Sequence, residues 1–280
     1  MLSIESARLR SWRAHLALEF ERRAARTVLA ARRHEGPLVV QKTLYPEGDA
    51  VCHGIVVHPP GGLAGGDDIG LNAHLDVDAH ALLTTPGAGK WYRSVGPAAR
   101  QSIQFEIGPG ACLEWLPQEN IVFNGAHAEL PTVVRLASDG SYIGWEISCL
   151  GRSGSGENFA TGRYRARTFI ERDHRALWLE NACLEGGGAA LQAAAMLAGR
   201  PVVATMLAVS EKLDSAVLGM CRSVQPVTGD GAVTLLPGII VGRYLGGSSE
   251  AAKKYFIKLW HLVRPVVAGR EAVEPRIWQT

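Results

Sequence analysis

One short segment of the sequence brings together the side-chain types that bind transition metals. Cys52, His53 and His58 precede Asp67 and Asp68, and a Pro-Gly turn separates the two groups. Thiolate, imidazole and carboxylate ligands all suit a borderline metal such as nickel or zinc. Neighbouring residues of a strand point to opposite faces, so at most one of Cys52 and His53 can join His58 in one coordination shell. The segment supports, as an alternative interpretation, a metal-binding hydrolase that uses the residues from Cys52 to Asp67.

A second set of polar side chains alternates with apolar ones. His74, Asp76, Asp78 and His80 are separated by single leucine, valine and alanine residues. In a strand, this period of two places all four polar groups on one face. That face could bind a divalent cation weakly, or it could be the ordinary solvent-exposed face of a half-buried strand. We favour the second interpretation.

Two glycine-rich segments resemble catalytic motifs but lack required residues. The run Gly87-Ala88-Gly89-Lys90 ends like a phosphate-binding loop, yet Thr84 and Trp91 stand where that motif needs glycine and then serine or threonine. The segment from residue 151 to residue 156 lacks the last glycine of a nucleophile elbow, and a strand pattern follows it where a dinucleotide loop needs a helix. We therefore expect a surface turn, a flexible loop and no catalytic residues.

Composition limits the classes of protein to which the chain can belong. Its 280 residues are 47% hydrophobic, which predicts a large core, and a formal charge of +2 argues against nucleic-acid binding. No apolar window is long enough for a membrane span, and the first residues lack the pattern of a signal peptide. The cysteines are odd in number and widely spaced, which favours reduced thiols in the cytoplasm. They are Cys52, Cys112, Cys149, Cys183 and Cys221.

Alternating hydrophobicity predicts strands over the first two thirds of the chain. Leu16, Leu18 and Phe20 alternate with Ala17 and Glu19, as in a half-buried strand. Clusters of Gly, Pro, Asn and Asp separate this run from others like it, as expected for turns. Many short strands at this spacing indicate a sandwich, a barrel or layered sheets. The other runs cover residues 38–42, 51–57, 69–77, 102–107, 112–116, 133–136, 142–150, 164–171 and 176–184.

The last third of the sequence carries helical patterns. Ser210 and either Ser248 or its neighbour are suitable N-caps for two of them, and Pro265 is expected to end the longest. Residues 233–236 and 239–244 are expected as strands between the helices. No low-complexity linker is present, so we predict one mainly β domain over residues 1–280, with a few helices mostly in the C-terminal third. The expected helices are Ala189–Leu197, Ser210–Arg222 and Ser248–Val263.

Several long motifs follow one another in the order found in one known family. They lie at residues 36–48, 52–67, 84–94, 113–126, 144–159 and 264–280. These motifs resemble those of the urease accessory protein UreD family, also called UreH. Asn120 and Asn124 depart from the usual form, which has threonine and aspartate at these two positions. The resemblance covers nearly the whole chain, and residues 189–238 are its least distinctive part.

The resemblance implies a fold of stacked, helically wound β-sheets. It also implies a protein without catalytic residues that binds apo-urease together with UreF and the GTPase UreG. In that role the protein supports the GTP-dependent delivery of nickel to the urease active site. Nickel would pass along an internal path rather than remain as a cofactor, so we expect no closed metal site.

Four carboxylates are candidates for such a path because each falls in or beside an otherwise apolar run. They are Asp67, Glu114, Glu146 and Glu180. A cation in transit needs ligands that bind weakly and release it, and inward-facing carboxylates would serve. The alternative for each is a hydrogen-bonded core or surface carboxylate. A buried carboxylate is costly without partners, so several buried together would favour a hydrated path.

Overall fold

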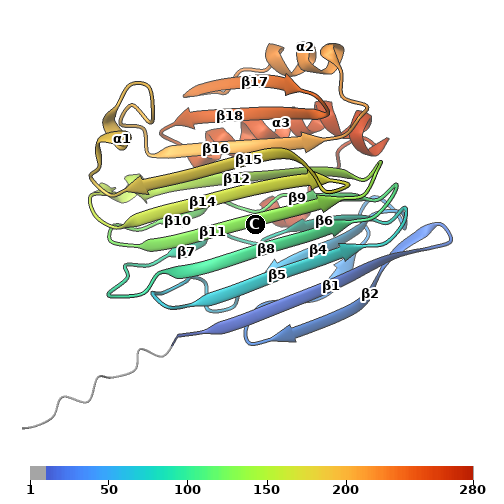
Figure 1. Cartoon of the computed structure of the whole chain (residues 1–280), viewed down its shortest axis with the longest axis horizontal. Coiled ribbons are helices and arrows are strands. Elements are labelled where there is room, and N and C mark those ends of the chain that lie inside the picture. Colours follow the sequence, from blue (N-terminus) through green and yellow to red (C-terminus); the bar gives the residue numbers. More distant parts are fainter. Residues whose placement is uncertain (1–10, 280) are drawn as a thin grey trace, which may run out of the picture.

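Two β-sheets packed face to face form most of the structure, a computed structural model that describes residues 11–279. The smaller sheet has seven strands and lies in front in Figure 1. In spatial order it consists of β15 (Arg175–Glu185), β14 (Arg163–Arg172), β11 (His127–Leu136), β8 (Ala99–Ile107), β5 (Asp68–Leu75), β1 (Arg13–Arg23) and β2 (Arg26–Glu35).

The larger sheet lies behind the smaller one and continues above β15 in Figure 1. In spatial order it consists of β17 (Asp230–Leu236), β18 (Ile239–Gly246), β16 (Val202–Val209), β12 (Ser141–Arg152), β9 (Cys112–Trp115), β6 (His80–Thr84), β4 (Cys52–Val57) and β3 (Val39–Leu44). Three short strands join it outside this path: β7 (Gly89–Trp91), β10 (Asn120–Val122) and β13 (Glu157–Asn158).

The chain winds between the two sheets as a helix of strands. From β4 onward it alternates between the larger sheet (β4, β6, β9, β12) and the smaller sheet (β5, β8, β11, β14), and neighbouring strands of each set are parallel. Each winding therefore adds one strand to each sheet. Strands β16, β17 and β18 then extend the larger sheet in antiparallel fashion. The expectation of stacked, helically wound sheets is confirmed.

The alternation of the sequence explains why these segments become strands. In β1, Leu16, Leu18 and Phe20 are buried while the residues between them face outward. In β6, by contrast, all residues are buried, because both faces of the larger sheet are covered there. One apolar core fills the space between the sheets, and a second lies between the larger sheet and the helices.

Three α-helices follow the windings, namely α1 (Ala189–Gln192), α2 (Ser215–Ser223) and α3 (Ser249–Ala268). The expected first helix was too long, since α1 gives way to turns in which Ala198 and Gly199 have positive φ. The expected start of the second helix was also wrong. Asp214, not Ser210, caps α2, because its carboxylate accepts hydrogen bonds from the backbone N–H groups of Ala216 and Val217.

Helix α3 packs on the outer face of the larger sheet, against β12, β16 and β18. Ser248 caps its first turn as expected, accepting from the N–H of Ala251. Pro265 does not end the helix, which continues to Ala268 and stops before the left-handed Gly269. A proline removes one backbone donor but does not forbid a helix whose flanking residues are firmly packed. No helix of the described part, residues 11–279, is both long and apolar enough to cross a membrane.

The expected polar face at residues 74–80 is not formed. Strand β5 ends at Leu75, and a turn over residues 76–79 carries the chain to the other sheet. His74 is exposed on the smaller sheet, whereas His80 is buried at the start of β6. The alternation of polar residues continued through the turn, where Asp78 has a positive φ, so the period of two did not mark a single strand.

Candidate functional site

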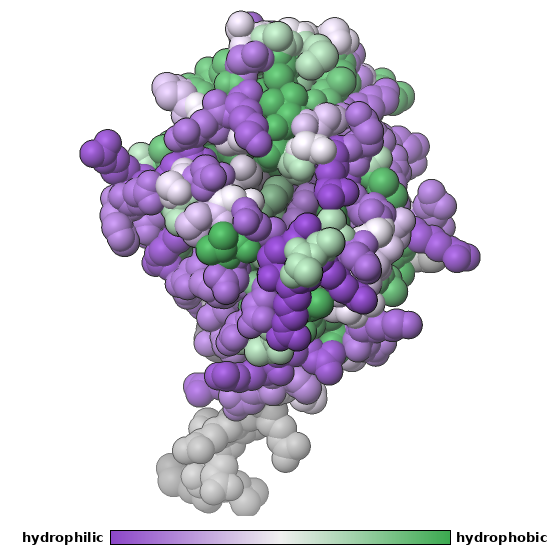
Figure 2. All heavy atoms as spheres, turned by 90° about the vertical axis from the view of Figure 1, so that its right-hand side faces the viewer, coloured by the Kyte–Doolittle hydropathy of each residue, from purple (hydrophilic) through white to green (hydrophobic). Residues whose placement is uncertain are grey.

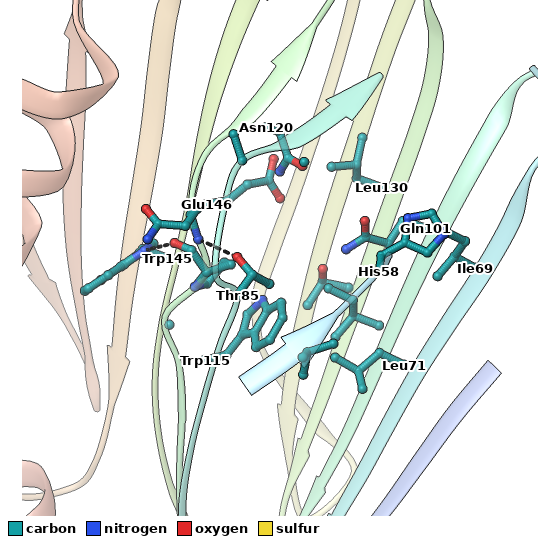
Figure 3. A pocket seen from close by; sticks show the side chains of 18 of the residues that line it. His58, Ile69, Leu71, Thr85, Gln101, Trp115, Asn120, Leu130, Trp145 and Glu146 are labelled. Carbon is teal, nitrogen blue, oxygen red and sulfur yellow. Dashed lines mark hydrogen bonds between the residues drawn. The ribbon is translucent and has the colours of Figure 1, made fainter. Parts of the chain in front are cut away.

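A cavity of about 340 Å³ lies between the two sheets. Its wall is mostly apolar, with inward-facing side chains such as Leu71, Leu130 and Trp115. Figure 3 shows His58 on one side of the cavity and Glu146 on the other. An apolar chamber with few polar groups is the usual form of a small-ligand site, since the polar groups then fix what binds.

A row of polar side chains leads from this cavity across the larger sheet. The strand register pairs Glu146 of β12 with Thr205 of β16, and Thr205 with Arg243 of β18. Glu146 and Thr205 line the cavity. Arg243 comes next in the row and lies outside the lining. The row therefore runs from the interior of the sandwich toward β18.

A matching row runs across the smaller sheet. Thr132 of β11 pairs with Thr168 of β14, and Thr168 pairs with Glu180 of β15. The two threonines line the cavity, while Glu180 lies on the last strand of this sheet. An ion pair between Glu180 and Arg243 joins the outer ends of the two rows. Hydroxyl and carboxylate oxygens thus form a polar strip through an otherwise apolar interior.

Glu146 is the carboxylate that faces the cavity. It is half-buried, and its Oε1 accepts hydrogen bonds from the Tyr164 hydroxyl at 2.5 Å and the Ser148 hydroxyl at 3.3 Å. Burial raises the pKa of the Glu146 carboxyl, the Tyr164 hydrogen bond opposes that effect, and the negative charge of Glu180 adds to it. A cation nearby would offset both the desolvation penalty of the Glu146 carboxylate and its repulsion by the charge of Glu180.

Glu180 is held by Arg243. Nη1 of Arg243 donates to Glu180 Oε1 and, at 2.6 Å, to Thr205 Oγ1. The guanidinium carbon lies 5.5 Å from the centre of the Trp178 ring. Because β15 and β18 belong to different sheets, this ion pair bridges the sandwich at its edge.

Asp67 lies away from the cavity lining, in the loop before β5. It is only 2% exposed. Its two oxygens accept hydrogen bonds from the backbone N–H groups of Trp12 and Ala64, each at 2.7 Å. Both carboxylate oxygens are therefore engaged in fixing the loop to the chain just before β1.

Glu114 of β9 is fully buried beneath α3. Its carboxylate lies 2.8 Å from His80 Nε2 and accepts a hydrogen bond from Trp260 Nε1 at 2.6 Å. Its two oxygens share the single Nε–H of Arg264, each at 3.0 Å. Burial alone would raise the pKa of Glu114, but the His80 hydrogen bond and the charges of His80 and Arg264 lower it to about 2. The carboxylate ties α3 to the larger sheet.

The same network reaches the loop before β4. Nη2 of Arg264 lies 2.8 Å from Glu47 Oε1, and His53 Nε2 lies 2.6 Å from the same oxygen. Arg264 Nη1 donates to the backbone oxygen of Glu271. Two buried carboxylates thus share one guanidinium, which fixes the segment after α3 as well as the helix.

The cysteine and histidine residues of the segment 52–68 do not converge. Cys52 is buried in the core between the sheets, whereas His53 turns to the opposite side of β4 and meets Glu47. His58 lines the cavity, and burial lowers the pKa of its imidazole. Within residues 11–279, no three His, Cys, Asp or Glu side chains stand close enough together to hold a metal ion.

The two glycine-rich segments lie at turns next to strands. Lys90 and Arg93 are exposed as expected, and the turn from Pro86 to Ala88, which leads into β7 at Gly89, forms part of the cavity wall. Residues 151–156 end β12 and include a single 3₁₀ turn at Ser153–Ser155. Sequence reasoning therefore placed these turns correctly but did not predict that the first borders the cavity.

Sequence reasoning missed four residues of the polar strip. Each threonine is a single polar residue at an inward position of a strand, a signal that needs knowledge of which face is inside. Arg243 gave no local signal, because its partner Glu180 is 63 positions away. The four are Thr132, Thr168, Thr205 and Arg243.

Comparisons with known proteins match one family over almost the whole of the described chain. A family model described as "UreD urease accessory protein" matches residues 13–279. The chain is 55% identical over 269 residues to "Urease accessory protein UreD" of Azoarcus sp. (strain BH72), which covers 96% of this chain and 94% of the relative. It is 50% identical over 274 residues to the protein of the same name from Dechloromonas aromatica (strain RCB), covering 96% and 95%. For the Pseudomonas aeruginosa protein of that name the identity is 48% over 271 residues, covering 96% of each.

Proposed function

The chain belongs to the UreD family of urease accessory proteins, and we propose that it serves urease maturation as a scaffold without catalytic activity of its own. In this proposal it binds apo-urease together with UreF and the GTPase UreG. The complex delivers nickel to the urease active site at the expense of GTP hydrolysis by UreG. We place the complex in the cytoplasm, in keeping with five free cysteines.

The observation that carries the proposal is the cavity with its polar strip. Nickel(II) accepts carboxylate oxygen and imidazole ligands, and a cation that must move on needs few of them at a time. Glu146 at the cavity wall and Glu180 at the edge of the sandwich offer one carboxylate each. We therefore propose these two, of the four candidate carboxylates, as ligands for nickel in transit.

We assign structural roles to the other two candidates, Asp67 and Glu114. Backbone N–H groups engage both oxygens of Asp67, and His80, Trp260 and Arg264 surround Glu114. A cation at either carboxylate would have to displace these donors. Such an exchange in a buried site costs far more than exchange at the half-buried Glu146.

Exposed apolar side chains support the binding of protein partners. Figure 2 views the end of the sandwich seen at the right of Figure 1, and apolar atoms gather in its upper part, at the height of α2, β17 and α3. Among the exposed apolar side chains of these elements, Met220 of α2 is 45% exposed and Leu236 of β17 is 38% exposed. Large apolar side chains left in contact with solvent mark contact surfaces in soluble proteins.

The alternative of a metal-binding hydrolase has little geometric support. It would need Cys52, His58 and Asp67 to converge on one ion. Cys52 is sealed in the core, where burial raises the pKa of its thiol, and Asp67 is bound by backbone donors. No activated nucleophile results from this arrangement.

Urease activity in a reconstituted cell tests the proposal. Cells would express the urease subunits, UreF, UreG and a nickel carrier, with or without this chain. We expect activity, and nickel bound to urease, only when the chain is present. Full activity and full nickel content without it would refute the maturation role.

A further inference from the structure

We propose that the Glu180–Arg243 ion pair is the closed gate of a side exit from the cavity, through which a divalent cation leaves by replacing the guanidinium on Glu180. The inference deepens the function proposed above and rests on it for the identity of the cation, which is nickel. It adds a residue, Arg243, and a direction of movement toward the edge of the sandwich between β15 and β18.

The first argument is position. Thr168 and Thr205 line the cavity, and Glu180 and Arg243 are their outer neighbours in the strand registers. Because β15 is the last strand of the smaller sheet, no further strand of that sheet covers Glu180. The side chains of Arg243 and Glu180 are 41% and 26% exposed. The ion pair therefore lies between the cavity-lining threonines and solvent at this edge.

The second argument is that the ion pair can open without unfolding the protein. Arg243 is held by Glu180, by the Thr205 hydroxyl and by stacking on Trp178. All three contacts involve a long side chain whose head is partly in water, and such ion pairs contribute little to the stability of a fold. Rotation of Arg243 into solvent leaves every strand in place.

The third argument comes from charge. A cation bound at Glu146 meets at Glu180 a carboxylate that is already neutralised by Arg243. A divalent cation attracts that carboxylate more strongly than the guanidinium does, so it can take the Glu180 oxygen while Arg243 turns outward. The exchange breaks a hydrogen-bonded ion pair and forms a metal–oxygen contact, with no transfer of protons or electrons.

The fourth argument is a buried donor beside the gate. Nε1 of Trp178 is sealed from outside solvent and has no hydrogen-bond partner among the described residues. A buried N–H without a protein partner calls for water or another oxygen. A hydrated gap between β15 and β18 would supply that oxygen and would carry a cation with part of its water shell.

Titration of the purified full-length chain with nickel chloride tests the gate. Arg243→Gln removes the positive charge that is paired with Glu180. We expect this variant to bind Ni²⁺ roughly tenfold more tightly than the unmodified chain, because the bound cation no longer meets a nearby positive charge. Arg243→Met should show the same gain, whereas Arg243→Lys should not. The double variant Arg243→Gln with Glu180→Gln should lose the gain.

The matched control is Arg163→Gln. Arg163 of β14 pairs with Glu185 of β15 between side chains that are 48% and 53% exposed, away from the cavity lining. If both charge-removing variants at Arg243 bind no tighter than this control, or if the double variant keeps the gain, the gate is refuted. The titration contains neither urease nor partner proteins, so its failure overturns the gate alone. Urease activation that proceeds without the chain overturns the proposed function and with it the identity of the cation, whereas the titration still tests the gate itself.

Discussion

Arg264 of α3 lies beneath its own helix against Glu114 of β9, with Nε 3.0 Å from both carboxylate oxygens and 150 positions between the two residues. Neither side chain has measurable exposure. The pair is a fully buried polar contact between the helical layer and the larger sheet. Glu114 therefore holds α3 on the larger sheet and does not face the cavity.

Breaking this pair should destabilise the protein strongly. Arg264→Met leaves Glu114 buried without its main partner, and we expect a loss of about 3–5 kcal/mol in the free energy of unfolding, measured by urea denaturation. The exposed pair of Arg135 and Glu171 supplies the control. Arg135→Met should cost less than about 1 kcal/mol. Equal effects of the two substitutions would contradict the role given to Glu114.

Stability should fall in acid because of the same carboxylate. The pKa of Glu114 is lowered to about 2 in the folded protein, against 4.5 for an ordinary glutamate. A group whose folded pKa is depressed stabilises the fold above its unfolded pKa, and the contribution disappears as the pH falls from about 4.5 toward 2. The expected loss is about 3 kcal/mol. Urea denaturation at a series of pH values should show this loss in the unmodified chain and not in Glu114→Gln, and parallel curves would argue against it.

Glu146→Gln should fold normally and impair nickel delivery. The amide has the shape of the carboxylate and can still accept the Tyr164 hydrogen bond, so the free energy of unfolding should change by less than about 1 kcal/mol. Urease matured in its presence at limiting nickel should carry several-fold less metal, and excess nickel should restore it. Glu129→Gln, on a half-buried residue of β11 that lies outside the cavity lining, is the control. Normal metal content with Glu146→Gln would remove this residue from the path.

Trp278 is the anchor of the segment after α3. Its Nε1 donates to Thr84 Oγ1 at 2.8 Å, and its ring lies 5.6 Å from that of Trp145. Trp278→Ala should cost about 2 kcal/mol of unfolding free energy, less than for a fully buried tryptophan. We also expect less co-purification with UreF, because we propose that this aromatic segment contributes to the UreF contact. Trp12→Ala, at a residue 56% exposed, should change neither measurement, and similar losses from both would show a nonspecific effect.

Local patterns in the sequence predicted the elements but not their partners. The alternation of Leu16, Leu18 and Phe20 predicted β1, and Ser248 predicted the start of α3, because both signals lie within a few residues. Pro265 was wrongly predicted to end α3, which continues to Ala268, because packing of the flanking residues outweighed the loss of one backbone donor.

The candidate site could be predicted only in part for the same physical reason. Glu146 and Glu180 were identified because a carboxylate in an apolar run is unusual. What distinguishes them from Glu114 is the partner that each one meets: Arg243 for Glu180, Arg264 for Glu114. These pairings depend on how the windings stack, which no local period encodes.

The order of the elements along the chain has a consequence for biosynthesis. Each winding of strands can pair with the previous one as soon as it leaves the ribosome, but α3 is made after all the strands. Until then the outer face of the larger sheet is bare, and Glu114 lacks the donors of Trp260 and Arg264. A nascent chain halted before α3 therefore exposes an apolar sheet face on which Glu114 keeps only His80 as a partner, and that stage of synthesis is the one most exposed to aggregation.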